Sequence, residues 1–541
     1  MKRRDFIKNI SLAGTAGLTL SGIPVNLLGG NAALKKMALE SDNENVLVFI
    51  QLHGGNDALN TLIPVSQYNE YYNLRPNIAI PDYGTRSFIN IDNTADESKQ
   101  VGLHPDMLSF KEMYDTGKVA VVQNVGYPDM NLSHFRGRDI VFMGGDAKSD
   151  YESGWMGRFL DNTYPGYPDD YPDDKMPDPI GLELSGTLSL AFHRENGIPI
   201  GLNIGNPEQF YELISNLGVE PPITLPNSHA GDELKYIMEF EKKSNQYAGR
   251  LKEVFDNGNN SSVEYPEVYP FATRGASRNP ISGQLKLIAR LLKGGIKTRI
   301  FLVRIGGFDT HGEQVEQYDS TLGVHAALLY HLSSAIKAFY DDLENLGMDQ
   351  KVMGITFTEF GRRAYSNASY GTDHGTSTPV FIFGTGLNPG IYGQNPDLNN
   401  LHNGNLKYEI DYRQIYTSIV QDWFGADDDT LSKTGFNEWV NNKLPLIGTT
   451  GRNFTPVNNK LLQIYPNPIK NDLNIFINLD KQSYIEISIF ITGGQMIKKL
   501  KYKGKFGDNQ LQIPMGSEKN GMYFIKVRTE NQNLTGSFMK L

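Results

Sequence analysis

The stretch TRIFLVRIGGFDTH, residues 298–311, decides the fold of this chain. It begins with an apolar run, turns at a glycine pair and ends on the polar residues Asp309 and His311. A short apolar run bounded by glycines is typical of a strand buried on both faces of a sheet. Polar side chains directly after such a strand lie at the sheet edge where α/β proteins form their binding sites.

The same pattern recurs along the middle of the chain. The matching stretches are VLVFIQLHGG (46–55), KVAVVQNVG (118–126) and KVMGITFTEFGR (351–362). Segments with apolar residues at helical spacing separate them, notably residues 282–295 and 322–347. Strands that alternate with helices predict an α/β fold with a mostly parallel sheet and helices on both faces.

Composition limits the classes of function. The net charge of −10 gives no basic surface for nucleic acid. The chain has no cysteine, which excludes disulfides, thiolate metal sites and cysteine nucleophiles. After the N-terminus no segment carries roughly eighteen consecutive apolar residues, so we expect no transmembrane helix.

The 541 residues divide into four predicted parts. These are a signal segment (1–33), an α/β domain (45–446), a polar linker (447–459) and a C-terminal domain (460–541). In the last part DLNIFINL, YIEISIFI and GMYFIKVRT alternate apolar and polar residues, which predicts a small antiparallel β-sandwich. A further Pro-, Asp- and Tyr-rich segment, 161–181, predicts a solvated surface loop, with a calcium site or a lid as alternatives.

The first residues, MKRRDFIKNI, resemble a twin-arginine export signal with Arg3 and Arg4 as the pair. An ordinary secretory signal is the alternative. Either signal predicts export, and either is excluded from reasoning about the fold.

Polar residues at four predicted strand ends are the candidates for chemistry. The candidate metal ligands are Asp57, Asp309, His311, Glu359, Asp373 and His374. The candidate catalytic residues are Ser133, Arg136 and Arg138. Carboxylates and neutral imidazoles bind zinc, manganese or calcium, and one or two such ions can stabilise a displacement at phosphorus or sulfur. A serine hydroxyl at a helix start beside a metal is a candidate nucleophile.

Each candidate also has a structural interpretation. The alternatives are a turn residue for Asp57, a helix N-cap for Ser133, a hydrogen-bonded pair for Asp309 with His311, and an ion pair for Glu359 with Arg362 or Arg363. His134 stands next to Ser133 without an assigned role, and His53 is open to either interpretation. His325 and His331 lie in an amphipathic helix and are interpreted as packing or surface residues.

Several stretches together resemble one bacterial family of exported proteins, designated DUF1501. They are LHGGNDALNTLIP, NLSHFRGRDIVFMGG, IGGFDTHGEQ, TFTEFGRRAYSNASYGTDHGTSTPVFIFGTGL and DYRQIYTSIVQDWFG, and they span most of residues 45–424. The layout of this family is similar to that of the alkaline phosphatase and sulfatase superfamily. That similarity implies a nucleophile at Ser133 and metal ligands at Asp57 or Asn56, at Asp309 and His311, at Glu359, and at His374, with Asp373 as a ligand or an orienting partner.

Three departures from the superfamily pattern bear on this assignment. Phe360 follows Glu359 where the superfamily often has histidine, and Asp309 and His311 are unusually close together. Asp57 also comes later after its strand than is usual. The sequence therefore leaves three alternatives open: a site for two ions, a site for one ion, and a site without metal in a protein that has lost catalysis.

The C-terminal stretches LLQIYPNPIKNDLNIFI and GMYFIKVRTENQNLTGSFMKL resemble the sorting domain of the type IX secretion system of Bacteroidetes. The resemblance implies passage through the periplasm to the cell surface or the medium. A carbohydrate-binding or adhesive β-domain is the alternative.

Together these features predict an exported, metal-dependent hydrolase of phosphate or sulfate esters. Its expected partners are an anionic small-molecule or glycan ester and the export machineries. Two alternatives remain: a non-catalytic binding protein at the cell surface, and an esterase that acts on carbohydrate acyl groups.

Overall fold

The computed structural model describes residues 43–448, except 169, 216–246 and 272–275, together with 18–20, 23–25 and most of 462–540. The chain divides into two compact units, Met1–Thr450 and Gly451–Leu541. The predicted signal pair Arg3 and Arg4 and nearly all of the predicted linker lie outside the described residues. Among the described residues, no helix is both long enough and apolar enough to cross a membrane.

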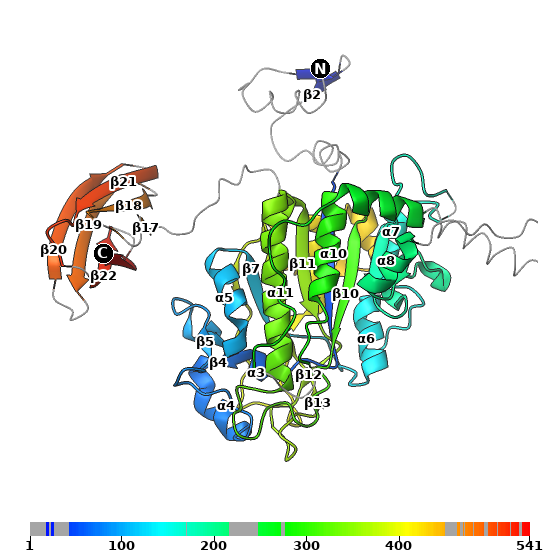
Figure 1. The fold of residues 1–541 in the computed structure, drawn as a ribbon, viewed down its shortest axis with the longest axis horizontal. Helices are drawn as coiled ribbons and strands as arrows, with labels where there is room; N and C mark the ends of the chain where they lie inside the picture. Colours follow the sequence, from blue (N-terminus) through cyan, green and yellow to red (C-terminus); the bar gives the residue numbers. More distant parts are fainter. Residues whose placement is uncertain are drawn as a thin grey trace, which may run out of the picture. The chain divides into compact units, whose positions relative to one another are not determined.

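A nine-stranded sheet forms the centre of the first unit (Figure 1). Its strand order is β15-β7-β14-β11-β3-β10-β8-β9, and β16 pairs with β7. The strands are β3 (Val46–His53), β7 (Val119–Gly126), β8 (Gly181–Leu184), β9 (Leu202–Ile204), β10 (Ile300–Gly306), β11 (Val352–Phe357), β14 (Thr378–Gly384), β15 (Gly390–Tyr392) and β16 (Ile410–Asp411). Only β14 runs antiparallel to its neighbours. The prediction of a mostly parallel sheet is therefore confirmed.

Helices cover both faces of this sheet, as predicted. One face packs against α5 (Leu108–Asp115), α10 (Ser282–Lys293) and α11 (Val324–Leu346); α10 and α11 stand in front of the sheet in Figure 1. The other face packs against α6 (His134–Met143), α7 (Trp155–Thr163) and α12 (Tyr412–Ser418). In β3 successive residues alternate between these two apolar cores, because neighbouring side chains of a strand point to opposite faces.

Short elements connect the main ones. They are α3 (Ala58–Thr61), β4 (Leu62–Pro64), α4 (Tyr68–Leu74), β5 (Ile89–Asn90), β6 (Val101–Leu103), α8 (Pro207–Ser215), β12 (Gly361–Arg362), β13 (His374–Gly375), α13 (Asp428–Thr434) and, near the N-terminus, β1 (Leu18–Leu20) with β2 (Ile23–Val25). The small sheet of β12 and β13 lies below the main sheet in Figure 1, near the N-terminal end of α6.

The segment 161–181 is less exposed than its composition predicts. Tyr167 and Met176 are buried in the apolar core. Asp178 is fully buried and accepts a hydrogen bond of 2.9 Å from Arg250. The segment is therefore a loop anchored to the domain at several points, rather than a freely solvated one.

The C-terminal unit is an antiparallel β-sandwich, as predicted. One sheet contains β17 (Leu462–Tyr465), β18 (Asp472–Leu479) and β21 (Gly507–Pro514). The other contains β19 (Ser483–Ile491), β20 (Met496–Gly504), β22 (Gly521–Arg528) and β23 (Asn533–Lys540). Alternate isoleucines of β18 and β19 meet in one core between the sheets.

Candidate metal centre

Asp309 is the centre of a group of charged and polar side chains at the ends of the strands. It lies in the loop after β10, and three imidazoles, one from the same loop and two from other elements, approach its carboxylate. Oδ1 of Asp309 is 3.2 Å from Nε2 of His311 and 3.3 Å from Nε2 of His374, and Oδ2 is 3.4 Å from Nε2 of His134. Residues from α6, the β10 loop and β13 thus meet at one point.

The local backbone explains how these loops approach one another so closely. Gly54, directly after β3, has φ +124°, which is in the region that favours glycine. A Cβ atom at Gly54 would lie 2.2 Å from the backbone nitrogen of Asp309. The glycine after the first strand therefore allows the β3 loop to pack directly against the β10 loop.

Each of the three imidazoles is held through its Nδ1 atom. Nδ1 of His134 is 2.9 Å from Oε1 of Glu359, and Nδ1 of His311 is 3.3 Å from Oδ1 of Asp373. Nδ1 of His374 donates to the carbonyl oxygen of Leu132 at 2.9 Å. Because a carboxylate or a carbonyl oxygen accepts a hydrogen bond, a neutral ring held in this way has its proton on Nδ1 and its lone pair on Nε2, the nitrogen that faces Asp309. Nε2 of His374 is also within hydrogen-bond distance of Oδ1 of Asp309, at 3.3 Å.

This arrangement fits a metal ion. His134, Asp309 and His374 each offer a ligand atom, and these atoms all lie within 4.8 Å of one another. Nε2 of His134 is buried and has no hydrogen-bond partner among the described residues. Burial lowers the pKa of His374, which favours the neutral, metal-binding form of its ring. Imidazoles oriented through Nδ1 are the usual arrangement around protein-bound metals.

Arg362 fixes the position and charge of Asp309. Its fully buried guanidinium donates to Oδ1 of Asp309 at 2.6 Å and to the carbonyl oxygens of Gly55 and Thr372 at 2.8 and 3.0 Å. Burial alone would raise the pKa of Asp309, but the hydrogen bond and charge of Arg362 outweigh it and lower the pKa. Asp309 is therefore ionised at neutral pH while Oδ2 remains directed at His134.

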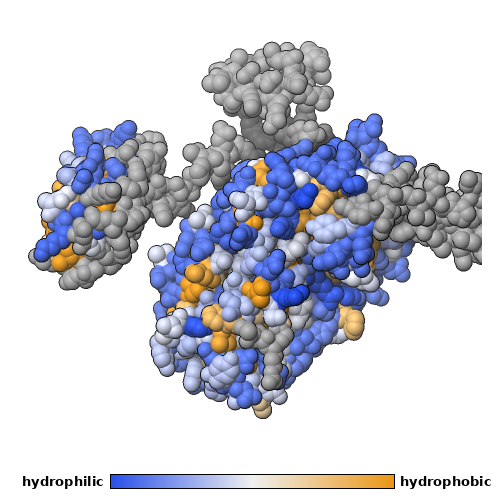
Figure 2. All heavy atoms as spheres, viewed as in Figure 1, coloured by the Kyte–Doolittle hydropathy of each residue, from blue (hydrophilic) through white to orange (hydrophobic). Residues whose placement is uncertain are grey.

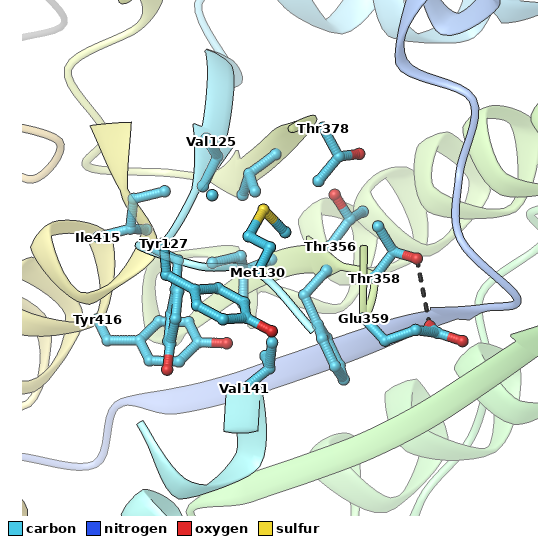
Figure 3. Close-up of a pocket in the computed structure, with 15 residues that line it drawn as sticks. Val125, Tyr127, Met130, Val141, Thr356, Thr358, Glu359, Thr378, Ile415 and Tyr416 are labelled. Carbon is cyan, nitrogen blue, oxygen red and sulfur yellow. Dashed lines mark hydrogen bonds between the residues drawn. The ribbon is translucent and has the colours of Figure 1, made fainter. Parts of the chain in front are cut away.

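Glu359 lies behind the histidines. Its Oε1 accepts the backbone N–H of Gly54 at 2.8 Å and lies 3.4 Å from Nδ1 of His53. Figure 3 shows Glu359 beside Thr358 in the wall of a cavity that Tyr127 and Tyr416 also line. This cavity has a volume of about 30 Å³, the share of one water molecule, so it is too small for a substrate. Glu359 thus orients His134, and it pairs with neither Arg362 nor Arg363.

Asp57 lies outside this group. It is fully buried, and Nη1 of Arg75 donates to both of its carboxylate oxygens, at 2.9 and 2.7 Å. Gln314 donates to Oδ2 at 2.6 Å. Burial raises the pKa of Asp57, but Arg75 lowers it further, so the net shift is downward. Both oxygens therefore have N–H partners, and Asp57 is not part of the group of possible ligand atoms around Asp309.

Ser133 is the N-cap of α6 and directly precedes His134. Its exposed hydroxyl accepts the N–H of Arg136 in a long contact of 3.5 Å. The side chain of Arg136 turns toward Ser149 and Asp150. Arg138 contacts Asp139 at 3.1 Å. Ser133 thus directly precedes a member of the group, and both arginines have their contacts with residues outside it.

His134 is the residue whose role the sequence analysis missed. The available signal was its place directly after Ser133, at the first turn of a helix that follows a buried strand. Of the predicted ligands, Asp309, His311 and His374 meet here, and Glu359 and Asp373 hold histidines. His325 and His331 are buried in α11, as the packing interpretation predicted.

The fold and this group define an α/β protein with a candidate metal centre and a separate C-terminal β-sandwich. Residues 44–434 match the family described as "Protein of unknown function (DUF1501)", and the chain belongs to that family. Residues 463–540 match the secretion system C-terminal sorting domain, which indicates export to the cell surface or the medium. The predicted resemblances to the DUF1501 family and to the sorting domain are both confirmed. A comparison with curated proteins finds no matching sequence.

Three of the solved structures that are similar to this chain are a protein of the alkaline phosphatase superfamily, a sulfatase and an alkaline phosphatase. A protein in the alkaline phosphatase superfamily from Vibrio parahaemolyticus is 12% identical, with 85% of this chain and 83% of that chain covered and a TM-score of 0.28. A sulfatase from Pseudoalteromonas sp. is 10% identical, with coverage of 89% and 86% and a TM-score of 0.30. Alkaline phosphatase from the Antarctic bacterium TAB5 is 10% identical, with coverage of 73% and 100% and a TM-score of 0.25. At these scores the likenesses carry no argument about fold or chemistry.

Proposed function

We propose that this protein is an exported, metal-dependent hydrolase of phosphate or sulfate esters. The observation that carries the proposal is the convergence of three imidazole Nε2 atoms on Asp309, each ring held through Nδ1. The buried Nε2 of His134 has no hydrogen-bond partner among the described residues, and a bound metal ion would supply one. About half of the Asp309 and His311 side chains is exposed, so a ligand has access to the group.

His134, Asp309 and His374 would hold the ion, with His311 as a fourth ligand. Three nitrogen donors and one carboxylate favour zinc or manganese over calcium, which prefers six to eight oxygen ligands. Among the described residues the ligand atoms form one such group, so the proposal takes one ion. A bound divalent ion supplies a Lewis acid beside the ester.

Ser133 is the nucleophile of this proposal. Its hydroxyl is exposed at the start of α6, next to a metal-binding histidine in the sequence. The N-terminal end of a ten-residue helix also favours an anionic group nearby. Ser133, Asp309, Glu359 and His374 follow one another along the chain in an order similar to the superfamily layout described above. This similarity supports a phosphoryl or sulfuryl group as the group that is transferred.

The route of export is part of the proposal. The twin-arginine-type signal would deliver the folded protein to the periplasm, and the C-terminal sorting domain would direct it outward. A metal loaded before export would remain bound, because both routes carry folded protein.

Turnover of two ester classes tests this function. The full chain, reconstituted with zinc or manganese, is assayed on aryl phosphates and aryl sulfates, beside His374→Ala and the exposed His402→Ala as a control. We expect metal-dependent turnover of one class in the wild type and in His402→Ala, and its loss in His374→Ala. Absence of turnover on both classes by the metal-loaded wild type would contradict the proposal.

A further inference from the structure

A second cavity, of about 220 Å³, lies on the sheet face that α6 covers. Gln51 of β3, Glu183 of β8 and Arg304 of β10 line it from the sheet, and Arg138 lines it from α6. In the strand register Arg304 pairs with Gln51, and Glu183 pairs with Leu302, so the three side chains project from the same face. The cavity is much larger than one water molecule.

This cavity contains donors without acceptors. The guanidinium of Arg304 makes no hydrogen bond or ion pair with any described residue, although the side chain is partly buried. Nε2 of Gln51 is also without a partner among the described residues, and Gln51 is only 2% exposed. Burial, and then the charge of Arg138, lower the pKa of Arg304. Nε2 of Gln51 is thus a buried donor without an acceptor in the described part of the chain, which costs free energy that a bound acceptor would recover. Arg304, which is only partly buried, adds a positive charge beside it.

The two acids of the cavity are already engaged. Glu183 accepts a hydrogen bond from Oγ of Ser185 at 2.7 Å and from the backbone N–H of Ser189 at 2.8 Å. Asp139 pairs with Arg138 at 3.1 Å. Neither carboxylate pairs with Arg304, so Arg304 and Gln51 both line the cavity with donors available to an anion that has several oxygens. Arginine binds sulfate, phosphate and carboxylate groups through paired hydrogen bonds.

The cavity adjoins the metal-binding group through two elements. β3 carries Gln51 in the cavity and His53 beside Glu359, two residues apart on the same face. α6 carries Arg138 in the cavity and His134 in the metal-binding group, four residues apart on the same helix face. Two residues of strand and four residues of helix each span about 6–7 Å. The positive charges of Arg304 and Arg138 also act on His53.

We propose that this cavity, hereafter the oxyanion cavity, binds a second sulfate or phosphate group of the substrate, next to the ester that faces the metal-binding group. The backbone spacing of about 6–7 Å along β3 and α6 sets the scale of the separation between the two groups. The substrate class is then a small molecule or glycan unit with two oxyanions at this spacing. The claim that the bound anion is part of the substrate rests on the proposed function. The claim that the cavity binds an anion does not depend on it.

The first test therefore uses protein without metal. The full chain is treated with chelator and titrated with inorganic sulfate by calorimetry at low ionic strength. We expect Arg304→Gln to bind sulfate at least about tenfold more weakly than the wild type. Arg278→Gln, an exposed arginine elsewhere, serves as the control and should match the wild type. Arg138→Gln is the second variant if Arg304→Gln does not fold. Equal sulfate binding in wild type and a folded cavity variant, or none in the wild type, would overturn the proposal.

The second test asks whether the anion belongs to the substrate. 1,3-Propanediol bis-sulfate and propyl sulfate are compared as ligands of the zinc-loaded wild type and Arg304→Gln. We expect the bis-sulfate to bind the wild type at least about tenfold more tightly, and the two compounds to differ by less than about twofold in the variant. If inorganic sulfate binds but the bis-sulfate gains nothing, the cavity takes free anions and its substrate role is overturned. If the bis-sulfate gains affinity but no ester is hydrolysed, the binding inference stands and the proposed function fails.

Discussion

Nδ1 of His134 lies 2.9 Å from Oε1 of Glu359, and this contact determines which ring nitrogen faces the metal-binding group. With its proton on Nδ1, His134 presents the lone pair of Nε2 toward Asp309. The contact joins the start of α6 to the segment that directly follows β11. Glu359, which the sequence analysis proposed as a metal ligand, is thus a buried carboxylate that orients His134, a ligand of the proposed metal centre.

Glu359→Gln tests this orienting role. The amide has the same shape but lacks the negative charge of the carboxylate that accepts the hydrogen bond from Nδ1 of His134. We expect zinc affinity to fall about 10- to 100-fold without loss of the fold. Zinc titration with a competing chelator measures the change, and the exposed Glu438→Gln is the matched control. Unchanged affinity in Glu359→Gln would mean that the contact does not tune the ligand.

Asp57→Asn separates a stabilising residue from a metal ligand. Arg75 and Asp57 are both fully buried, so loss of one charge leaves the other without its partner. We expect the free energy of unfolding to fall by about 3–5 kcal/mol in denaturant titrations. The zinc content of the folded variant should equal that of the wild type and of the exposed control Asp174→Asn. Loss of zinc at unchanged stability would instead identify Asp57 as a ligand.

Ser133→Asn separates a nucleophile from a helix cap. Asparagine caps a helix as well as serine does, so the melting temperature should change little. Because the hydroxyl is absent, we expect ester turnover to fall by several orders of magnitude. Wild-type turnover in Ser133→Asn would show that Ser133 serves only as the N-cap, and that water attacks the ester.

His325 makes stability depend on pH. It is fully buried beside Asn56, and burial lowers its pKa from 6.5 to about 4. The folded state therefore binds this proton less readily than the unfolded state, so the contribution is complete above pH 6.5 and declines as the pH falls toward 4. At pH 4.5 the loss should be about 2–3 kcal/mol.

Denaturant titrations of wild type and His325→Gln at pH 7.5 and 4.5 give the free energy of unfolding of each protein. The contribution of His325 is the difference between the declines that the two proteins show from pH 7.5 to pH 4.5. The variant lacks the titrating ring, so its stability should decline less between the two pH values. An equal decline in both proteins would show that His325 does not contribute.

The sheet could be predicted because its signal is local. The apolar runs of β3 and β10 are buried on both faces, and the glycines that follow them mark where each strand ends. Asp309 and His311 were found for the same reason, since they directly follow such a run.

The partners of individual side chains could not be predicted, because they depend on tertiary packing. Nothing in the sequence shows that Arg75 reaches Asp57, or that the first turn of α6 places His134 against Glu359. The oxyanion cavity also depends on register, since it is the pairing of β3 with β10 that brings Gln51 beside Arg304.

Metal content tests the central claim most directly. The full chain, His134→Ala and His402→Ala are loaded with zinc, freed of excess metal and analysed for zinc per folded chain. The account predicts about one zinc ion per chain in the wild type and in His402→Ala, and a large loss in His134→Ala. Zinc that is absent from the wild type, or equally present in all three proteins, would contradict it.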